Sequence, residues 1–140
     1  PGIFTENPAI VVNKFGAGKA IYVALELEKF DHPRDLFINL IKLLSDKFTF
    51  EAEAPKAVEI TVFHQEEKKR FLISLINFQH ELPNIPVEGI RVKIRLENKT
   101  PKSLKIVPEE RELNYKFDNR YVQFVTPKFE TLSMFTLDYS

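Results

Sequence analysis

The hydrophobic positions in the first part of the chain form two runs that are apolar on both alternating faces. The segments PAIVVNKF and AIYVALEL carry apolar side chains at almost every position. A strand that is apolar on both sides is normally covered on both sides, as in a layered α/β sheet. Gly16 and Gly18 lie between the two runs, where glycine permits a tight connection. The pattern therefore predicts a β-hairpin.

A helical period follows the predicted hairpin, in DHPRDLFINLIKLLSDKF at residues 31–48. Pro33 suits the first helical position, and Asp35 stands in the first turn, where the helix dipole favours a carboxylate. Apolar residues then recur at spacings of three and four, which places them on one face. These residues are Leu36, Phe37, Leu40, Ile41 and Leu44. We expect an amphipathic helix that covers the hairpin.

From about residue 57 the hydrophobic period changes to two. VEITVFH and RFLISLINF flank the charged turn QEEKKR, and GIRVKIRLE alternates apolar with basic positions. SLKIV, RELNYKF, RYVQFVT and ETLSMFTLDY follow, separated by turn residues. Short strands at such close spacing predict an antiparallel sandwich. The boundary between the two patterns falls at about residues 51–57.

These patterns together predict an α+β chain of two parts. Residues 1–52 are expected to form a hairpin and a helix that are the remnant of a layered α/β domain. Residues 56–140 are expected to form an immunoglobulin-like β-sandwich of about seven strands. The chain begins at Pro1 without an initiator methionine, and we expect it to be a fragment of a longer polypeptide.

Composition narrows the class of protein. The 140 residues are 44% hydrophobic and 29% charged, which is typical of a globular chain. Lysine and arginine equal aspartate and glutamate at 20 each, so the basic excess of a nucleic-acid-binding surface is missing. No apolar run reaches the roughly 18 residues that a membrane span needs. Cysteine is absent, which excludes disulfides and thiolate chemistry and fits a cytoplasmic location.

The stretch NKFGAGKA contains a glycine–lysine pair that resembles a phosphate-binding loop. Such a loop needs a glycine where Asn13 stands and a serine or threonine where Ala20 follows Lys19. It must also open a helix, whereas the residues that follow are predicted to form a strand. We therefore expect no nucleotide and no other cofactor.

Candidate catalytic and metal-binding residues are few. The three histidines, His32, His64 and His80, are far apart in sequence, and nothing near them prepares a metal site. Glu26 and Asp31, with His32, follow a predicted buried strand, where ligands gather in α/β sheets. A small independent enzyme built on these three residues is one hypothesis. Helix capping and solvation explain the same residues, and we favour that interpretation.

A carbohydrate ligand is a second hypothesis, because sugar rings stack on exposed aromatic side chains. The chain has no tryptophan, and most of its aromatic residues fall on strand positions expected to be core. Phe78 and His80, in the loop NFQHELPNIP, are the exception. We therefore keep a carbohydrate-binding module, using the sandwich or the loop of residues 78–86, as the alternative function.

The order of these elements resembles a known family. PAIVVNKFGAGKAIYVALELEKFDHPRDLFINLIKLL resembles the end of the glutamine-amidotransferase-like, or trimerisation, domain that follows the catalytic barrel in β-galactosidase-like glycoside hydrolases. The matching residues are Pro8, Ala9, Ile10, Asn13, Gly16, Gly18, Tyr22, His32 and Pro33. The second half looks like the small β-sandwich that ends the same chains.

The resemblance implies a non-catalytic accessory or assembly region. In that family the two catalytic glutamates lie on the barrel, and no part of this chain matches the barrel. We therefore assign no catalytic residue and expect the chain itself not to be an enzyme. If the hairpin and helix belong to a larger layered domain, their apolar faces lack cover, and exposed area of that size predicts association. We expect a homo-oligomer formed through residues 8–44.

Overall fold

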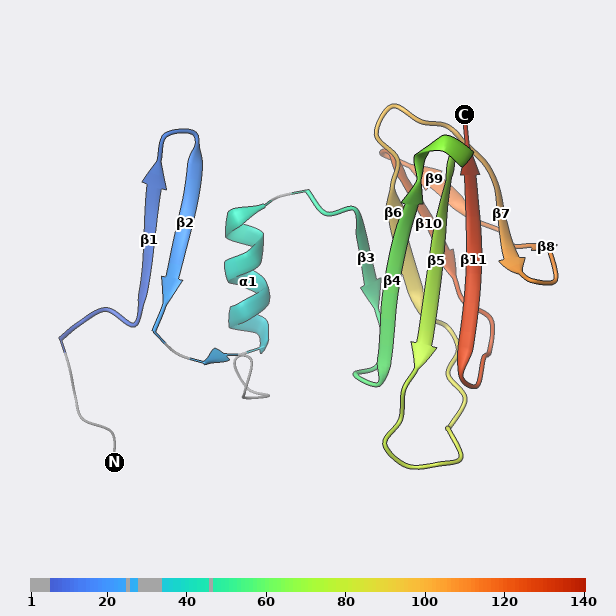
Figure 1. Cartoon of the computed structure of the whole chain (residues 1–140), viewed down its shortest axis with the longest axis horizontal. Helices are drawn as coiled ribbons and strands as arrows, with labels where there is room; N and C mark the ends of the chain where they lie inside the picture. The colour runs from blue at the N-terminus through green and yellow to red at the C-terminus, as the bar shows by residue number, and fades with distance from the viewer. Residues whose placement is uncertain (1–5, 25, 28–33, 46) are drawn as a thin grey trace. The chain divides into compact units, whose positions relative to one another are not determined.

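The computed structural model of the chain describes residues 6–24, 26–27, 34–45 and 47–140 (Figure 1). The chain divides into two compact units, Pro1–Phe48 and Thr49–Ser140. We call them the hairpin–helix unit and the sandwich unit. The division lies a few residues before the predicted boundary, because the segment after Thr49 pairs with strands of the second unit.

The hairpin–helix unit begins with the predicted β-hairpin. Strand β1, Ile10–Phe15, pairs antiparallel with β2, Gly18–Val23, and Phe15 stands opposite Gly18 at the turn. Gly16 has a φ of +58°, a backbone conformation that side chains disfavour. The glycines therefore serve a tight turn between strands, as the sequence predicts, and they do not open a helix.

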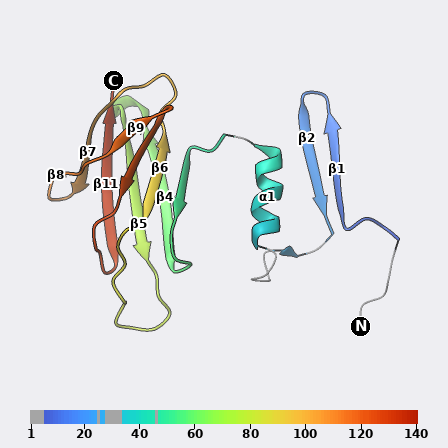
Figure 2. The same cartoon turned by 180° about the vertical axis from the view of Figure 1, so that it is seen from behind.

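Helix α1, Arg34–Leu44, lies beside β2, as both views of the unit show (Figures 1 and 2). The ammonium group of Lys19 on β2 donates a hydrogen bond to the carbonyl oxygen of Leu43 at 3.2 Å. Leu40 is buried, with 8% of its surface exposed. The predicted amphipathic helix is therefore present and contacts the hairpin.

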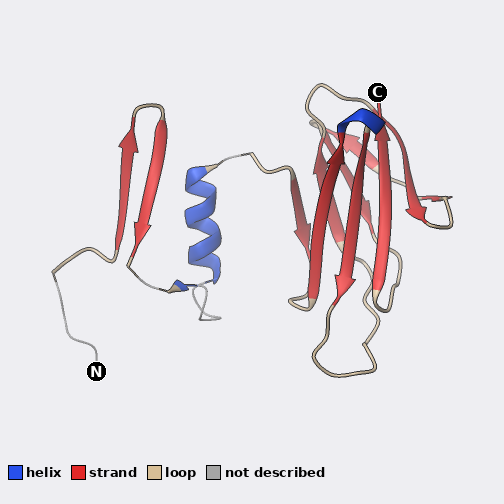
Figure 3. Cartoon of the chain, viewed as in Figure 1, coloured by secondary structure: helices blue, strands red, loops and turns tan. Residues whose placement is uncertain are grey.

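The sandwich unit consists of two antiparallel sheets (Figure 3). The first has the strand order β3 (Phe50–Glu53), β6 (Arg91–Arg95), β10 (Tyr121–Val125) and β9 (Lys116–Asp118). The second has the order β4 (Val58–Gln65), β5 (Arg70–Asn77), β11 (Leu132–Tyr139), β7 (Pro101–Val107) and β8 (Arg111–Glu112). A short 3₁₀ turn, η2 (Glu66–Lys68), joins β4 to β5 within the charged QEEKKR segment.

The core lies between the two sheets and follows the predicted alternation. Ile73 and Leu75 of β5 and Val92 and Ile94 of β6 are completely buried, and Phe135 of β11 lies among them. Residues between them on the same strands face outward, as a period of two requires. Burying each such side chain contributes roughly 1.5 to 3 kcal/mol. The period-two pattern therefore predicts both the sandwich and the buried face of its main strands.

The number of strands differs from the prediction of about seven for two reasons. Phe50–Glu53, which the sequence suggests is a linker, pairs with β6 as an edge strand. The predicted single strand RELNYKF is divided between β8 in one sheet and β9 in the other. Both differences concern short strands at sheet edges, where partners distant in sequence decide the pairing.

In the part of the chain that the structure describes, no helix is long and apolar enough to cross a membrane.

Candidate functional site

The predicted site residues of the hairpin–helix unit are only partly visible. Glu26 is described and exposed. Asp31 and His32 lie outside the described residues, so the grouping of these three side chains stays a prediction. Among the residues that are described, no group of three or more histidine, aspartate or glutamate side chains could hold a metal ion.

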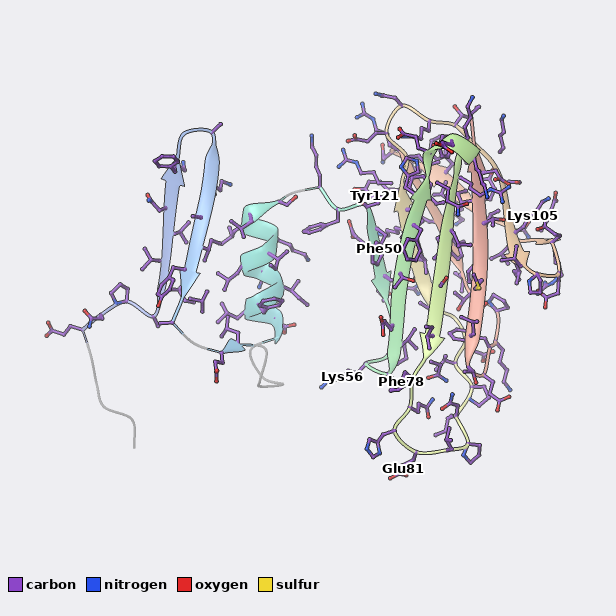
Figure 4. All side chains as sticks on the ribbon, in the orientation of Figure 1. Phe50, Lys56, Phe78, Glu81, Lys105 and Tyr121 are labelled. Atoms are coloured by element: carbon purple, nitrogen blue, oxygen red, sulfur yellow. The ribbon has the colours of Figure 1, made fainter. Side chains whose placement is uncertain are left out.

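The other two predicted site residues, Phe78 and His80, lie on the long loop between β5 and β6. Figure 4 labels Phe78 at the start of this loop. Both are exposed, and Phe78 keeps 79% of its surface exposed. Two further apolar side chains of this loop, Leu82 and Ile85, are exposed as well. The loop therefore presents a mainly apolar surface to its surroundings.

Asn77, the last residue of β5, holds the loop in place. Its side chain is 1% exposed, and its amide donates hydrogen bonds to the carbonyl oxygens of Ile85 at 2.9 Å and Glu130 at 2.8 Å. Its side-chain oxygen accepts a hydrogen bond from Gln79 at 2.9 Å. One buried amide thus ties the start of the loop and Ile85 to the segment that precedes β11.

Gln79 and Asn84 complete this polar network. Gln79 bonds the backbone of Ile85 twice, donating to its carbonyl oxygen at 2.7 Å and accepting from its N–H at 3.1 Å. The amide of Asn84 donates to the carbonyl oxygen of Asn77 at 3.0 Å. The Oδ1 atom of Asn84 is buried and has no hydrogen-bond partner in the described chain. The loop is therefore fixed by side-chain amides that are aimed at its own backbone.

Because these side-chain amides bond to the backbone of the loop itself, they limit which ligands the loop can bind. Sugar recognition combines an aromatic surface with polar groups that bond the hydroxyls. Phe78 supplies the first, but Asn77, Gln79 and Asn84 use their amides within the loop. Ile76 and Leu132, cross-strand partners at the end of β5 and the start of β11, add exposed apolar surface nearby. The arrangement favours an apolar contact surface over a sugar-binding one.

A second polar cluster lies at the opposite ends of β4, β5 and β11. The ring of His64 stacks on Phe71 with 4.3 Å between centroids, and its Nε2 lies 2.8 Å from the hydroxyl of Tyr139. The ammonium group of Lys99 lies 5.3 Å from the centre of the Tyr139 ring. Burial raises the pKa of the Tyr139 phenol above 10.0, and the Glu66 carboxylate raises that pKa further. The cluster joins three adjacent elements and has a structural role.

The hairpin–helix unit carries the largest share of exposed apolar surface. Ten of the eighteen exposed large apolar side chains among the described residues belong to it. On the face of the hairpin that carries Val11 and Tyr22, the ring of Tyr22 is 67% exposed, and Phe15 at the turn is 85% exposed. On the helix, the predicted apolar residues other than Leu40 remain partly exposed. The unit thus has more apolar surface than the described residues cover.

Sequence patterns revealed only part of these surfaces. Phe78 and His80 stood out because an aromatic pair occurs in a proline-bearing loop. The network of Asn77, Gln79 and Asn84 gave no signal, because its partners come from residues 85 and 130–131, and the pairing with residue 130 is distant in sequence. Asparagine and glutamine in a loop are ordinary, and only the fold shows that one of them is buried.

Comparison with known proteins gives a fold relationship. No protein-family model and no curated protein sequence matches the chain. Among solved structures, it resembles the α-L-fucosidase isoenzyme 2 from Paenibacillus thiaminolyticus, with a TM-score of 0.74 and 21% identity. The match covers 95% of this chain and 22% of that chain. This fold is shared with part of a glycoside hydrolase.

The extent of the match includes both units. The sandwich unit, Thr49–Ser140, is too short to account by itself for a match over 95% of the chain. The hairpin–helix unit must therefore contribute to the likeness. The chain spans about a fifth of the length of the fucosidase that it resembles. At 21% identity the relationship concerns the fold.

Proposed function

We propose that this chain is a non-catalytic accessory region of a glycoside-hydrolase-like protein. The observation that carries the proposal is the fold likeness over 95% of the chain to only 22% of an α-L-fucosidase. A segment of that size is too short for the (β/α)8 barrel of the family that the sequence resembles, since such barrels need about 250 residues. The chain's own strands form an antiparallel sandwich, which is a different architecture.

The finer assignment is to the β-galactosidase-like group. It is supported by the residues that the hairpin shares with that family, among them Asn13, Gly16, Gly18 and Tyr22. In this assignment the hairpin–helix unit is the end of a layered amidotransferase-like domain. The sandwich unit is then the immunoglobulin-like domain that closes the chain.

The accessory role that we propose is assembly, with a second copy of this chain as the partner of the hairpin–helix unit. The exposed fractions of its ten apolar side chains add up to roughly five whole side chains, on the order of 800 Å² in total over the two faces of the hairpin and the helix. A standard stable interface buries about 800 Å² on each partner. Two copies with a formal net charge of +0 also do not repel each other through their overall charge.

Carbohydrate binding is the alternative function, and the exposed Phe78 ring favours it. Titration with neutral oligosaccharides, observed through ¹⁵N–¹H amide shifts, distinguishes the two functions. Shifts centred on residues 78–86 that disappear in Phe78→Ala support the alternative. Titration without any shifts at these residues excludes the loop as a site for neutral sugars.

The absence of catalysis has a direct test. The chain is assayed with chromogenic α-L-fucosides and β-galactosides, beside a glycosidase as positive control. We expect hydrolysis no faster than in buffer. Hydrolysis above that background that is lost in Glu26→Gln or Asp31→Asn, with the fold intact by circular dichroism, contradicts the proposal and supports the small-enzyme hypothesis.

A further inference from the structure

A pocket of about 600 Å³ opens in the sandwich unit where the chain passes from β8 to β9. Three basic residues line it, Arg91 and Lys93 of β6 and Lys116 of β9. Asn114 and Gln123 add two side-chain amides, and Tyr115 adds a ring. The remaining walls are apolar. The pocket therefore combines positive charge, hydrogen-bonding groups and an apolar surface.

The register of the sheet places the two lysines on either side of the Gln123 amide. Lys93 on β6 and Lys116 on β9 are both Cα partners of Gln123 on β10. Directly opposed residues point to the same face, and neighbouring strands are about 4.8 Å apart. The two lysine backbones are thus roughly 10 Å apart, and their long side chains reach a common point above Gln123.

Acidic residues do not neutralise this pair inside the pocket. No aspartate or glutamate of the fully described sandwich unit lines the pocket. Arg91 is paired with Glu53 at 3.1 Å, whereas the ion pairs found among described residues include neither Lys93 nor Lys116. Outside the pocket lining, Glu51 on β3 is the direct partner of Lys93 and points to the same face of the sheet, and Asp118 stands two residues beyond Lys116.

We propose that this pocket binds an acidic saccharide, with its carboxylate between Lys93 and Lys116. The two ammonium groups supply charge-assisted hydrogen bonds to the carboxylate, which are stronger than neutral ones. The amides of Asn114 and Gln123 bond ring hydroxyls, and the apolar walls with Tyr115 accept the C–H face of the sugar. The carbohydrate part of this assignment rests on the proposed association with glycoside hydrolases.

Titration of the full chain with trigalacturonate tests the assignment. We expect ¹⁵N–¹H amide shifts in residues 91–93, 114–116 and 123–125, and weaker binding as sodium chloride increases. A neutral trisaccharide of the same length is expected to bind at least about tenfold more weakly, because the carboxylate contacts are lost. Sulfate alone serves as the probe for simple anion binding.

The decisive variant is Lys93→Gln with Lys116→Gln, which keeps the length of both side chains. It is expected to weaken trigalacturonate binding at least about tenfold, since two charged contacts are removed. Lys68→Gln with Lys128→Gln removes the same charge from exposed positions outside the pocket and is expected to leave the affinity unchanged. Circular dichroism of both variants confirms that the sandwich is folded.

Three results overturn the assignment: no shifts at the pocket, equal affinity of the two double variants, or sulfate binding as tight as trigalacturonate binding. Each of them leaves the accessory role untouched. Conversely, hydrolytic activity of the chain would contradict the non-catalytic accessory role and would not affect the interpretation of these titrations. The two proposals therefore fail separately.

Discussion

Asn77 illustrates what single residues contribute to this fold. An asparagine at the end of a strand looks like an ordinary turn residue in the sequence, and the chain has several. In the structure its buried amide satisfies the carbonyl oxygens of Ile85 and Glu130. A buried amide needs such partners, because an unpaired polar group away from water costs free energy. The role could not be predicted from the sequence, since one of the two acceptors is distant in the chain.

Replacing Asn77 by alanine is expected to lower the free energy of unfolding by about 1 to 3 kcal/mol, because the hydrogen bonds of its buried amide to Ile85, Glu130 and Gln79 are lost. Chemical denaturation followed by circular dichroism measures the change. Asn114→Ala, at an exposed asparagine, is the control and should change stability by less than about 0.5 kcal/mol. Equal effects of the two substitutions would show that the network does not hold the loop.

The raised pKa of Tyr139 predicts that the folded chain loses stability at alkaline pH. Its phenol has a raised pKa in the folded chain, while the unfolded value is 10.0. Above about pH 10 the unfolded chain therefore releases this proton before the folded chain does, and rising pH favours unfolding. The contribution is fully present below pH 10 and is lost as the pH rises through the folded pKa.

Comparison with Tyr139→Phe isolates this effect, because the phenylalanine keeps the ring and removes the titrating group. Between pH 9 and pH 11 the stability of the natural chain should fall more steeply than that of the variant. Denaturation midpoints at each pH measure the slopes. Parallel curves would mean that the Tyr139 hydroxyl does not contribute to the alkaline loss.

At the scale of elements, the predictions from periodicity were accurate where the pattern was long. The hairpin, the helix and the main sandwich strands were all indicated by apolar spacing. Short edge strands were not predicted. Phe50–Glu53 carries two glutamates and resembles a linker in the sequence, yet it pairs with β6. Local composition does not determine such pairing, because the partner strand supplies the hydrogen bonds and the cross-strand contacts.

The two glycines of the hairpin turn are expected to respond differently to substitution. Gly16→Ala should destabilise the hairpin by about 1 to 2 kcal/mol, because its φ of +58° is strained for alanine. Gly18→Ala is the matched control, since its added Cβ meets the Phe15 oxygen at 3.5 Å, an ordinary contact. Amide hydrogen exchange in residues 10–23 reports the change. Faster exchange in both variants alike would contradict the turn described for this hairpin.

At the scale of the whole molecule, the chain joins a sandwich with its own core to a smaller unit that is apolar on its surface. The sandwich buries its large apolar residues between two sheets. The hairpin–helix unit buries few, and of its described apolar residues only Leu27 and Leu40 are nearly fully covered. The sequence predicts this imbalance through strands that are apolar on both faces. What covers those faces is not encoded in a local pattern.

We expect a second copy of the chain to cover them, as the proposed role in assembly requires. Phe15→Glu with Tyr22→Glu places charges on the exposed hairpin surface and should abolish self-association. Phe63→Glu changes an exposed phenylalanine of the sandwich unit and serves as the control. Both substitutions are at exposed positions, so the sandwich is expected to remain folded.

Light scattering coupled to size-exclusion chromatography at micromolar concentration measures whether copies of the chain associate. We expect the mass of a dimer or a larger oligomer for the natural chain and for Phe63→Glu, compared with 16.3 kDa for one chain. We expect a monomer for the hairpin double variant. A natural chain that elutes as a stable monomer, or a double variant that remains oligomeric, would contradict the proposed role in assembly.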